Sequence, residues 1–478
     1  MDHKLGEEVN SRFGKRIGEA LADPQIRRNF RNALDGVMAK RAEQFPDPDE
    51  LWQLRNLDKA IRANSLHKLP QLLEQLEQQL TDNGIQVHWA VDGEEANKIV
   101  SDILDGRGVK KIIKGKSMVT EETGLNHHLE QLGYEVIESD LGEYIIQLAE
   151  EPPSHIVAPA IHKSRLEIAD LFAEKFPDIP YTDDVDEMTH SARLILRKEF
   201  ASADAGISGV NFAVAETGTL CLVENEGNGR LSTTAPPIHI AVTGIEKVVE
   251  KLSDVPPLLS ILTRSATGQP ITTYFNMISS PRKEHELDGP EEVHLVLLDN
   301  GRSAIREDDE LDATLRCIRC GACINHCPVY VRVGGHAYGT VYPGPIGSVL
   351  EPQRLGIHEA GKLATACSLC GRCGEVCPVK IPLPQLINRI RAESNEAASD
   401  STVRGHNSLR NQKEVLTWKL WSALYCSPLL YGLFTRTATV LRVLAPSKLG
   451  AWTRYRKAPK PAARSLHAMA ARKGVDHE

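Results

Sequence analysis

The stretch CIRCGACINHCP, residues 317–328, places four cysteines within eleven residues and closes on a proline. A second stretch, CSLCGRCGEVCP at residues 367–378, repeats the same spacing and the same closing proline. Eight of the ten cysteines of the chain therefore lie in two short groups. In a reducing compartment such grouping indicates metal ligands rather than disulfides.

The spacing of both groups is that of the loops that bind [4Fe–4S] clusters in two-cluster ferredoxins. Three thiolates on a curled loop can bind three corners of one cluster, while the fourth cysteine points to the other cluster. We therefore expect two [4Fe–4S] clusters with crossed ligands, close enough together for electron transfer. The expected ligands are Cys317, Cys320, Cys323 and Cys377 for one cluster, and Cys367, Cys370, Cys373 and Cys327 for the other.

Small residues within the two groups fit this chemistry. Gly321, Gly371 and Gly374 allow backbone amides to approach the sulfurs and permit unusual backbone angles. Structural zinc is the alternative, but zinc sites usually combine two separated pairs of ligands around one ion. Four thiolates in eleven residues, found twice, favour iron–sulfur clusters. The two other cysteines, Cys221 in the apolar run TLCLV and Cys426, are predicted to be buried core thiols.

Length and composition indicate a globular protein of several domains. The 478 residues exceed one ordinary core, so we expect two or three domains. The first residues, MDHKLGEEVN, lack the apolar core of a signal peptide, and no segment offers 18 uncharged apolar residues for a membrane span. These features predict a cytoplasmic chain.

The net charge of −8 conceals an asymmetry along the chain. Residues 401–478 carry 14 Lys/Arg and 3 Asp/Glu, a local charge of +11 that leaves −19 on residues 1–400. An acidic body with a basic tail suggests docking to an acidic partner or to a membrane surface. No nucleic-acid partner is expected.

Four segments are expected along the chain. Residues 1–68 read as polar and helical, and should pack against the next segment. In residues 69–300 helices alternate with strands, which indicates a mostly parallel sheet covered by helices on both faces. Strand-like runs stop in residues 301–395, the expected two-cluster domain. Residues 396–478 read as a polar linker followed by a basic, Trp-rich helical tail.

Apolar periodicity predicts the individual elements of the central segment. The predicted helices are 69–80, 94–104, 123–132 and, beyond the cysteines, 383–393. The predicted strands are 85–91, 109–115, 134–139, 154–161, 220–226, 239–244 and 294–300.

The turn Lys114-Gly115-Lys116-Ser117 lies between a predicted strand and a predicted helix. A phosphate loop would need glycine at position 110, which is Lys110, and no G-x-G-x-x-G motif occurs in the chain. Nucleotide binding of either type is therefore unsupported. The two lysines and the serine could still bind an anion at a helix N-terminus, or the turn could simply be capped and solvated.

Several acidic residues and histidines allow two interpretations. Glu216, in the turn VAETGT (214–219), could contact a ligand, but turns often carry a carboxylate for solubility, which is the preferred interpretation. The same preference covers Glu121, Glu122, Asp140 and Glu143. Surface positions or core positions with hydrogen-bond partners are expected for His127, His128, His162 and His239, which have no metal-ligand spacing.

Taken together, these features resemble the lactate utilisation protein B family, the iron–sulfur subunit of the bacterial lactate-utilisation system. The resemblance rests on residues 114–148, 153–165, 210–249 and both cysteine groups. It implies an α/β lactate-utilisation domain similar to the sugar-phosphate isomerase and CoA-transferase fold, followed by an α-helical two-[4Fe–4S] ferredoxin domain. It also implies two companion proteins in the oxidation of L-lactate to pyruvate.

We therefore expect an electron-transfer subunit of a cytoplasmic lactate-oxidising complex, with its final acceptor open. One alternative is a subunit of another dehydrogenase, acting on glycolate or glycerol 3-phosphate. The other is a ligand-binding protein whose clusters sense redox state. If the hydroxy acid binds this chain, the basic turn with Lys116 and Ser117 would hold its carboxylate and Glu216 would orient its hydroxyl.

The C-terminal tail has two interpretations. Its mixture of Trp, Leu and Arg could form a peripheral membrane anchor at the inner face of the membrane. It could equally be a helical pair that docks on a partner. Docking on a partner is preferred, because Pro428 and Pro446 would interrupt a long amphipathic helix.

Overall fold

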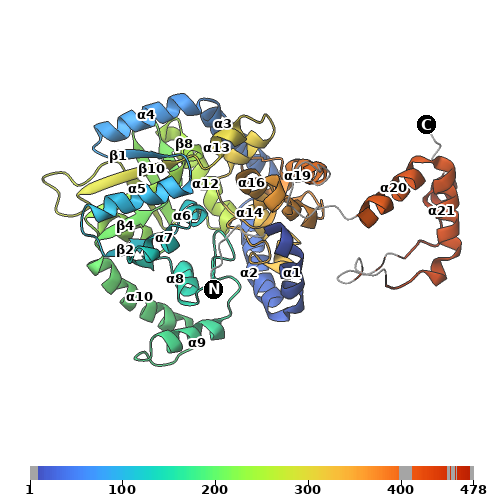
Figure 1. Cartoon of the computed structure of the whole chain (residues 1–478), viewed down its shortest axis with the longest axis horizontal. Coiled ribbons are helices and arrows are strands. Elements are labelled where there is room, and N and C mark those ends of the chain that lie inside the picture. Colours follow the sequence, from blue (N-terminus) through green and yellow to red (C-terminus); the bar gives the residue numbers. More distant parts are fainter. Residues whose placement is uncertain (1–8, 398–411, 449–452, 454–457, 459, 474–478) are drawn as a thin grey trace. The chain divides into compact units, whose positions relative to one another are not determined.

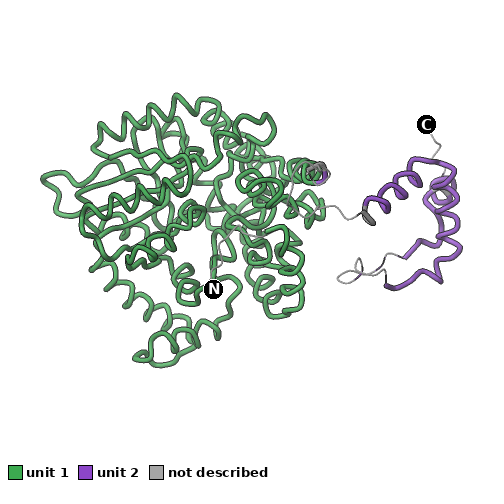
Figure 2. The backbone as a smooth tube through the Cα atoms, in the orientation of Figure 1, with its two compact units in different colours: residues 1–394 green, residues 395–478 purple. Residues whose placement is uncertain are grey.

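The computed structural model describes residues 9–397, 412–448, 453, 458 and 460–473 of the chain. The chain divides into two compact units, Met1–Ser394 and Asn395–Glu478 (Figure 2). The strands and all eight grouped cysteines belong to the first unit. The polar linker expected from residue 396 falls largely on residues 398–411, outside the described residues.

Three helices open the first unit, as predicted for residues 1–68. Two of them start in the same way, with an aspartate that accepts hydrogen bonds from backbone amides and with proline as the first helical residue. Proline suits this position because the first amide of a helix has no partner within the helix. The helices are α1 (Val9–Ala22), α2 (Pro24–Glu43) and α3 (Pro48–His67).

The main sheet has six strands in the order β1-β10-β7-β4-β2-β3. Every neighbouring pair is parallel, which confirms the predicted parallel sheet. The strands are β1 (Gln86–Ala90), β2 (Lys111–Lys114), β3 (Glu135–Glu138), β4 (Ala205–Ser208), β7 (Ile238–Gly244) and β10 (Glu292–Leu298).

Helices cover both faces of this sheet, as predicted (Figure 1). Successive strand residues point to opposite faces. Thus Ile112 packs with apolar residues of α5 and α7, whereas Ile113 packs with Tyr144, Leu196 and Phe200 of α8 and α10. The helices predicted in this region are present. The helices around the sheet are α4 (Leu69–Asp82), α5 (Gly93–Asp105), α6 (Met118–Thr123), α7 (Leu125–Gln131), α8 (Leu141–Leu148), α9 (Arg165–Lys175), α10 (Val185–Ser202) and α11 (Asn228–Thr234).

A second, four-stranded sheet was not predicted. Its order is β8-β5-β6-β9, and Cys221 lies fully buried in β6, as expected for a core thiol. Three of its four strands are short or half-exposed, so their apolar pattern is weak. The strands are β5 (Phe212–Val214), β6 (Thr219–Glu224), β8 (Val248–Val249) and β9 (Tyr274–Ile278).

The predicted strand at residues 154–161 is wrong, because this segment forms bends and turns. The ring of His155 turns the backbone: its Nδ1 accepts hydrogen bonds from the amides of Val157 and Ala158, each at 3.0 Å. Amides bound to a side chain in this way are not available to a strand partner.

Short helices make up the segment that carries the grouped cysteines, as predicted for an α-helical domain. Among the described residues, no helix is long and apolar enough to cross a membrane. The remaining elements of the first unit are η1 (Ile245–Lys247), η2 (Leu252–Asp254), α12 (Val255–Ala266), α13 (Arg302–Arg306), η3 (Leu311–Arg316), α14 (Ala322–Asn325), α15 (Tyr330–Val333), α16 (Gly344–Leu355), α17 (Ile357–Ala360), η4 (Gly361–Ala366), α18 (Arg372–Val376) and α19 (Leu383–Ala397). Those of the second unit are α20 (Gln412–Cys426), α21 (Pro428–Val440), η5 (Arg442–Leu444) and α22 (Leu466–Arg472).

The N-terminal helices pack on the cysteine segment, which lies far from them in the sequence. Helix α1 contacts α15 and α17, and α2 contacts α14 and α15 (Figure 1). Arg16 of α1 donates hydrogen bonds to the carbonyls of Ala337 and Tyr338, both at 3.2 Å. Phe30 of α2 packs edge-on against the ring of Tyr330. The N-terminal helices are therefore part of the core around the cysteines.

A buried network of charges joins the α/β part to the cysteine segment. Arg302 donates to both oxygens of Glu122, at 2.8 and 3.0 Å, and to Glu246. Tyr342 donates its hydroxyl hydrogen bond to Glu122, and Arg319 lies over the Tyr342 ring. Burial would raise the pKa of Glu122, but Arg302 and the arginines around it lower it to about 2. The interpretation of Glu122 as a solubilising surface residue is therefore wrong.

Replacing Gly206 with alanine should destabilise the first unit. A Cβ at Gly206 would lie 1.8 Å from the carbonyl oxygen of Ser232, where α11 crosses β4. We expect an increase in the free energy of the folded state of about 3 kcal/mol, the upper range for an overpacked core. Urea unfolding followed by circular dichroism measures it. Gly36→Ala, at an open position of α2, is the control and should stabilise by about 0.5 kcal/mol. Equal midpoints for the two variants would contradict the packing described.

Removing the guanidinium of Arg302 should also destabilise the folded chain. In Arg302→Met, the buried carboxylates of Glu122 and Glu246 lose their principal cation, which should cost about 3–5 kcal/mol. The matched control is Lys98→Met, whose partner Asp102 and own side chain are 60% and 74% exposed, and which should leave the stability almost unchanged. A similar loss of stability in both variants would show that the buried network does not hold the two parts together.

Candidate functional site

Two loops of the same shape carry the grouped cysteines. Each follows a 3-10 helix, η3 or η4, and leads into a short helix, α14 or α18. Arg319 and Leu369, at corresponding positions, have φ angles of 60° and 57°. Gly321 and Gly371, two residues later, have φ angles of 74° and 79°. The left-handed residues curl each loop so that its cysteine side chains turn inwards.

The four thiols of one set surround a cavity. Cys317, Cys320 and Cys323 of the first loop and Cys377 of the second line it together. Among the described residues, no three His, Cys, Asp or Glu side chains are arranged so that they could hold a single metal ion. The other residues that line the cavity are Ile156, Ile318, Gly321, Ile346, Pro378, Val379, Ile381 and Leu383.

The other four thiols form a second set. Cys327 interacts electrostatically with Cys367 and Cys370, and Cys373 interacts with all three. The helices α14 and α18, which carry Cys323 and Cys373, contact each other, so the two sets adjoin. The fourth cysteine of each loop thus lies with the three cysteines of the other loop.

The surroundings of these thiols favour their neutral form. Burial raises the pKa of Cys320 and Cys373 to about 12, and that of Cys327 and Cys377 to about 11. Metals bind the thiolate, so a metal centre at this place must displace protons as it assembles.

The donor set and the backbone around it fit iron–sulfur clusters. Amides point to the sulfurs: that of Arg319 lies 3.4 Å from Cys317 Sγ, and that of Leu369 lies 3.3 Å from Cys367 Sγ. Amide hydrogen bonds stabilise negative charge on ligand sulfur. A Cβ at Gly321 would lie 3.2 Å from Val157, and the φ angle of 74° is strained for other residues, so glycine suits this close approach of the loop to the α/β part.

Arginines from distant segments hold the second loop in place. Arg55 of α3 donates to the carbonyls of Cys377 and Gly374, at 2.8 and 2.9 Å. Arg391 of α19 donates to the carbonyl of Cys367 at 2.8 Å. Positive charge near a cluster favours its reduced, more negative state. Both arginines therefore position the second loop and add positive charge beside its cysteines.

The two sets differ in their access to solvent. Cys320, Cys323 and Cys377 of the first set are 7%, 9% and 5% exposed, and that set lies against the α/β part. In the second set Cys370 is exposed, and the adjacent Leu369 is 45% exposed. One set is thus enclosed, and the other opens to the surface.

A cluster of charges lies at the carboxyl ends of β2 and β3. Lys114, fully buried, contacts Glu138 at 2.7 Å and Glu121 at 3.5 Å. Burial would lower the pKa of Lys114, but these carboxylates raise it above its ordinary value. In open parallel sheets this edge is where ligands bind. Lys114, however, is fully engaged by its own carboxylates.

Lys116, two residues further, lies between this edge and the thiol cavity. Its ammonium donates to the carbonyl of Val157 at 2.7 Å and lies 4.0 Å from Glu143. Burial raises the pKa of the Glu143 carboxyl well above its ordinary value. The residue before Val157, Ile156, lines the cavity of the first thiol set. A short backbone segment therefore connects Lys116 to that cavity.

The structure groups Lys116 with Glu143, and not with Glu216. Ser117 is buried and caps α6, since its hydroxyl accepts a hydrogen bond from the amide of Thr120 at 3.3 Å. Glu216 is exposed on the β5–β6 turn and accepts from the amide of Leu252 at 2.9 Å. Within the described part of the chain, no hydrogen bond or ion pair joins Glu216 to Lys116 or Ser117. The turn at Ser117 is thus capped, as one of its two interpretations held, but it is buried and not solvated.

Other expectations have mixed outcomes. Glu121 and Glu143 are not solubilising surface residues, because they lie against Lys114 and Lys116. Cys426 is exposed, so its prediction as a buried thiol is wrong.

The expectation for the histidines is confirmed, because each has a hydrogen-bond partner. The pairs are His127 with Gln131, His128 with Ser101, His162 with Glu151 and His239 with Ser208. Asp140 caps α8.

Sequence reasoning missed the residues that support the site from a distance. His155, Arg55 and Arg391 lie in no motif, and each acts on the backbone of another segment or of its own turn. A buried polar residue in an apolar run, such as His155 in SHIVAPAI, was the one available signal, since such a side chain needs hydrogen-bond partners.

Family models match three parts of the chain. The LUD domain matches residues 73–298, and the 4Fe-4S dicluster domain matches residues 313–381, which contain all eight grouped cysteines. The C-terminal model of lactate utilisation protein B matches residues 389–475. The first unit thus contains a LUD domain with a parallel α/β core and a 4Fe-4S dicluster domain.

Curated relatives match almost the whole chain. Lactate utilization protein B of Bacillus subtilis is 41% identical over 472 residues, covering 96% of this chain and 95% of its own. The protein of that name from Shouchella clausii is 42% identical over 463 residues, 94% of each chain. A crystal structure of a DUF162 family protein from Deinococcus radiodurans aligns with 48% of this chain and 98% of its own, at 16% identity and a TM-score of 0.28. With such identity over nearly its full length, the chain belongs to the lactate utilisation protein B family.

Proposed function

We propose that this chain is the iron–sulfur electron-transfer subunit of a complex that oxidises L-lactate to pyruvate together with two companion subunits. Its relatives are named for lactate utilisation, and its dicluster domain supports a redox role. The oxidation releases two electrons and two protons, and one-electron carriers must take the two electrons in turn.

The observation that carries this proposal is the pair of adjoining thiol sets. In the proposal one [4Fe–4S] cluster is held by Cys317, Cys320, Cys323 and Cys377, and the other by Cys367, Cys370, Cys373 and Cys327. When bound, each cluster would carry one electron. The chain's own part is to hold the clusters side by side, exclude water from the first and leave the second near the surface.

Electrons would leave at the exposed edge of the second set. A groove lies one helical turn beyond Cys327. Val331 lines this groove, and its amide donates a hydrogen bond to the carbonyl of Cys327. Arginines of α2 and α15 make it positive, which suits an acidic acceptor. The residues that line the groove are Pro24, Arg27, Arg28, Arg31, Asn32, Val331 and Arg332.

Within this chain, Lys116 is our candidate for binding the carboxylate of the hydroxy acid. An ammonium has three donors, and Lys116 commits one of them to Val157. Glu143 replaces Glu216 as the carboxyl beside it, 4.0 Å from the Lys116 ammonium, where it would orient the hydroxyl of the hydroxy acid through a hydrogen bond. Ser117 acts as a cap and has no part in this assignment.

Cysteine variants should reveal the crossed ligands. Cys377→Ser should weaken the same cluster as Cys317→Ser, and Cys327→Ser the same cluster as Cys367→Ser, because each pair shares a cluster. Anaerobic EPR of the reduced proteins measures this as the signal that remains in each variant. Cys426→Ser, at an exposed cysteine outside both sets, should keep both signals and their magnetic interaction.

The crossed assignment would be wrong if Cys377→Ser left the same signal as Cys373→Ser. Both cysteines lie in the second loop, so uncrossed ligands require that result. If every variant except Cys426→Ser loses both signals, iron analysis shows how many clusters are missing. A variant that lacks a single cluster should contain about half the iron of the parent chain.

Substrate-linked reduction of the assembled complex tests the proposed function. We expect L-lactate to reduce the clusters under anaerobic conditions, and glycolate and glycerol 3-phosphate to reduce them far more slowly. Lys116→Met should slow the lactate-linked step about tenfold or more, the value of a lost charged hydrogen bond. Lys98→Met, an exposed lysine of α5, should leave it unchanged, and dithionite should reduce all three proteins equally.

Each contrary result has its own meaning. Equal reduction by glycolate or glycerol 3-phosphate would indicate a different dehydrogenase. Reduction by dithionite but by none of the substrates would indicate a redox sensor. An unchanged rate in Lys116→Met, with lactate reduction intact, would place the hydroxy acid on a companion subunit.

A further inference from the structure

The C-terminal unit exposes an unusual number of apolar side chains. Fifteen large hydrophobic residues are exposed among its described residues, against sixteen in the much longer first unit. Leu429 and Val443 are 87% and 86% exposed, and Leu444 and Val440 are 76% and 75% exposed. A surface of this kind is covered by something else in the cell.

An aromatic cluster joins the two main helices of this unit. Trp421 stacks on Tyr425 with ring centres 4.4 Å apart, and Tyr425 lies 5.0 Å from Tyr431 of α21. Pro428 is the first residue of α21, so it begins the second helix of a hairpin. Pro428, which argued against one long amphipathic helix, thus separates two short helices that pack against each other. Tryptophan and tyrosine are enriched where a membrane meets water.

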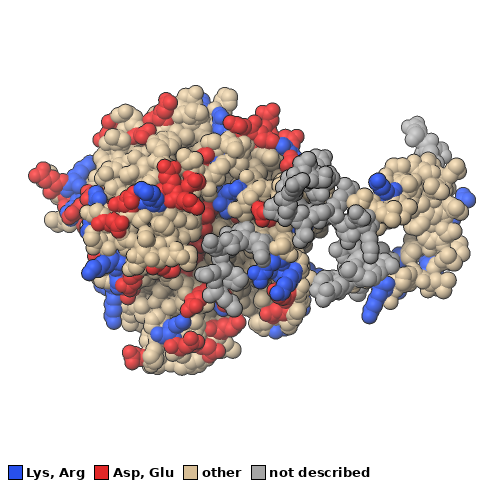
Figure 3. Space-filling view, in the orientation of Figure 1, with Lys and Arg blue, Asp and Glu red and all other residues tan. Residues whose placement is uncertain are grey.

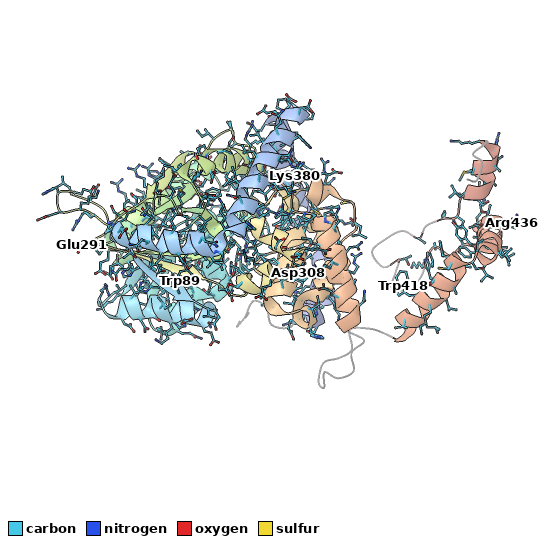
Figure 4. All side chains as sticks on the ribbon, turned by 90° about the horizontal axis from the view of Figure 1, so that it is seen from above. Trp89, Glu291, Asp308, Lys380, Trp418 and Arg436 are labelled. Carbon is cyan, nitrogen blue, oxygen red and sulfur yellow. The ribbon has the colours of Figure 1, made fainter. Side chains whose placement is uncertain are left out.

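Most of the C-terminal unit carries basic residues and no acidic ones. Residues 415–475 contain eleven Lys/Arg and no Asp/Glu. Among the described side chains of the unit no salt bridge forms, and Lys419, Arg436 and Arg442 are exposed. Figure 3 shows the visible surface of the unit in tan and blue, and Figure 4 shows Trp418 on α20 and Arg436 on α21. Cations and exposed apolar groups therefore occur on the same helices.

We propose that the C-terminal unit docks on the surface of a membrane that contains anionic lipid. Basic side chains near such a surface are attracted to it, and apolar side chains enter the boundary between headgroups and acyl chains. The exposed apolar residues occur on both α20 and α21, the helices that also carry Lys419 and Arg436. Basic side chains beside exposed apolar and aromatic side chains suit a surface of anionic lipid.

This proposal adds a location to the proposed electron transfer and does not depend on it. Docking of the basic unit would hold the first unit close to the membrane through the intervening residues. Membrane binding and lactate-linked reduction are measured separately, so the failure of one can be told from the failure of the other.

Co-sedimentation of the full-length chain with vesicles tests the proposal. We expect binding to vesicles of phosphatidylglycerol and phosphatidylcholine, and at least tenfold weaker binding to phosphatidylcholine alone. Raising the salt to about 0.5 M should weaken the binding to anionic vesicles, since added ions screen the attraction. Apolar insertion should leave part of the binding at that salt concentration.

Two variants separate the contributions of charge and apolar surface. The charge variant combines Lys419→Glu, Arg436→Glu and Arg442→Glu. The apolar variant combines Leu429→Ser, Leu433→Ser and Val443→Ser, all at exposed positions whose change should not disturb the fold. Each should bind anionic vesicles at least tenfold less well than the parent chain.

The matched control makes the same change of charge in the first unit. It combines Lys15→Glu, Lys98→Glu and Arg165→Glu, whose side chains are 68%, 74% and 57% exposed, and it should bind like the parent. Circular dichroism and iron content check that each variant is folded and loaded.

Three results would overturn the proposal. The parent chain could fail to sediment with anionic vesicles, both C-terminal variants could bind as well as the parent, or the control could lose as much binding as the charge variant. A fourth would redirect it: no vesicle binding, with a complex between the chain and a purified companion subunit that the apolar variant abolishes, would make this unit a protein-docking surface.

Discussion

A buried thiol with a pKa of about 11 or 12 is neutral at pH 7, whereas a cluster ligand must be a thiolate. Cys320, Cys327, Cys373 and Cys377 lie in such surroundings, and the protein must hold them in place until clusters replace their protons. The N-terminal helices serve this purpose although they lie far from the cysteines in the sequence. Arg55 of α3 fixes the carbonyls of the second loop, and α1 and α2 cover α15 and α14. Removing residues 1–68 would therefore expose the cysteine loops rather than trim a peripheral extension.

The need to hold the thiols in place also explains the contacts between the LUD domain and the dicluster domain. The two are parts of one compact unit, joined by the buried charges around Arg302 and by the close approach of Gly321 to Val157. Lys116 donates a hydrogen bond to the carbonyl of Val157, and the preceding residue, Ile156, lines the cavity of the first thiol set. An oxidation at the edge of the sheet would thus take place beside the enclosed set of thiols, and the exposed set would face the acceptor.

Local patterns were sufficient to predict the parallel sheet, its covering helices and the two groups of cysteines. These features depend on apolar periodicity and on short spacings, which are read within a short window of sequence. The second sheet was missed because strands such as β8, Val248–Val249, are too short to show a period. Residues 154–161 were assigned to a strand because they are apolar, but the His155 ring takes the amides that a strand would need. Glu122 and Glu143 look like surface carboxylates in the sequence, since their cationic partners come from distant segments or from across a turn.

The central claim is that the two adjoining thiol sets hold two iron–sulfur clusters that interact. Anaerobic iron and sulfide analysis of the purified chain, combined with EPR of the dithionite-reduced protein, tests it most directly. The account predicts about eight iron and eight sulfide per chain, with a spectrum broadened by coupling between two reduced [4Fe–4S] centres. Iron near zero with bound zinc, or a single uncoupled cluster, would contradict it.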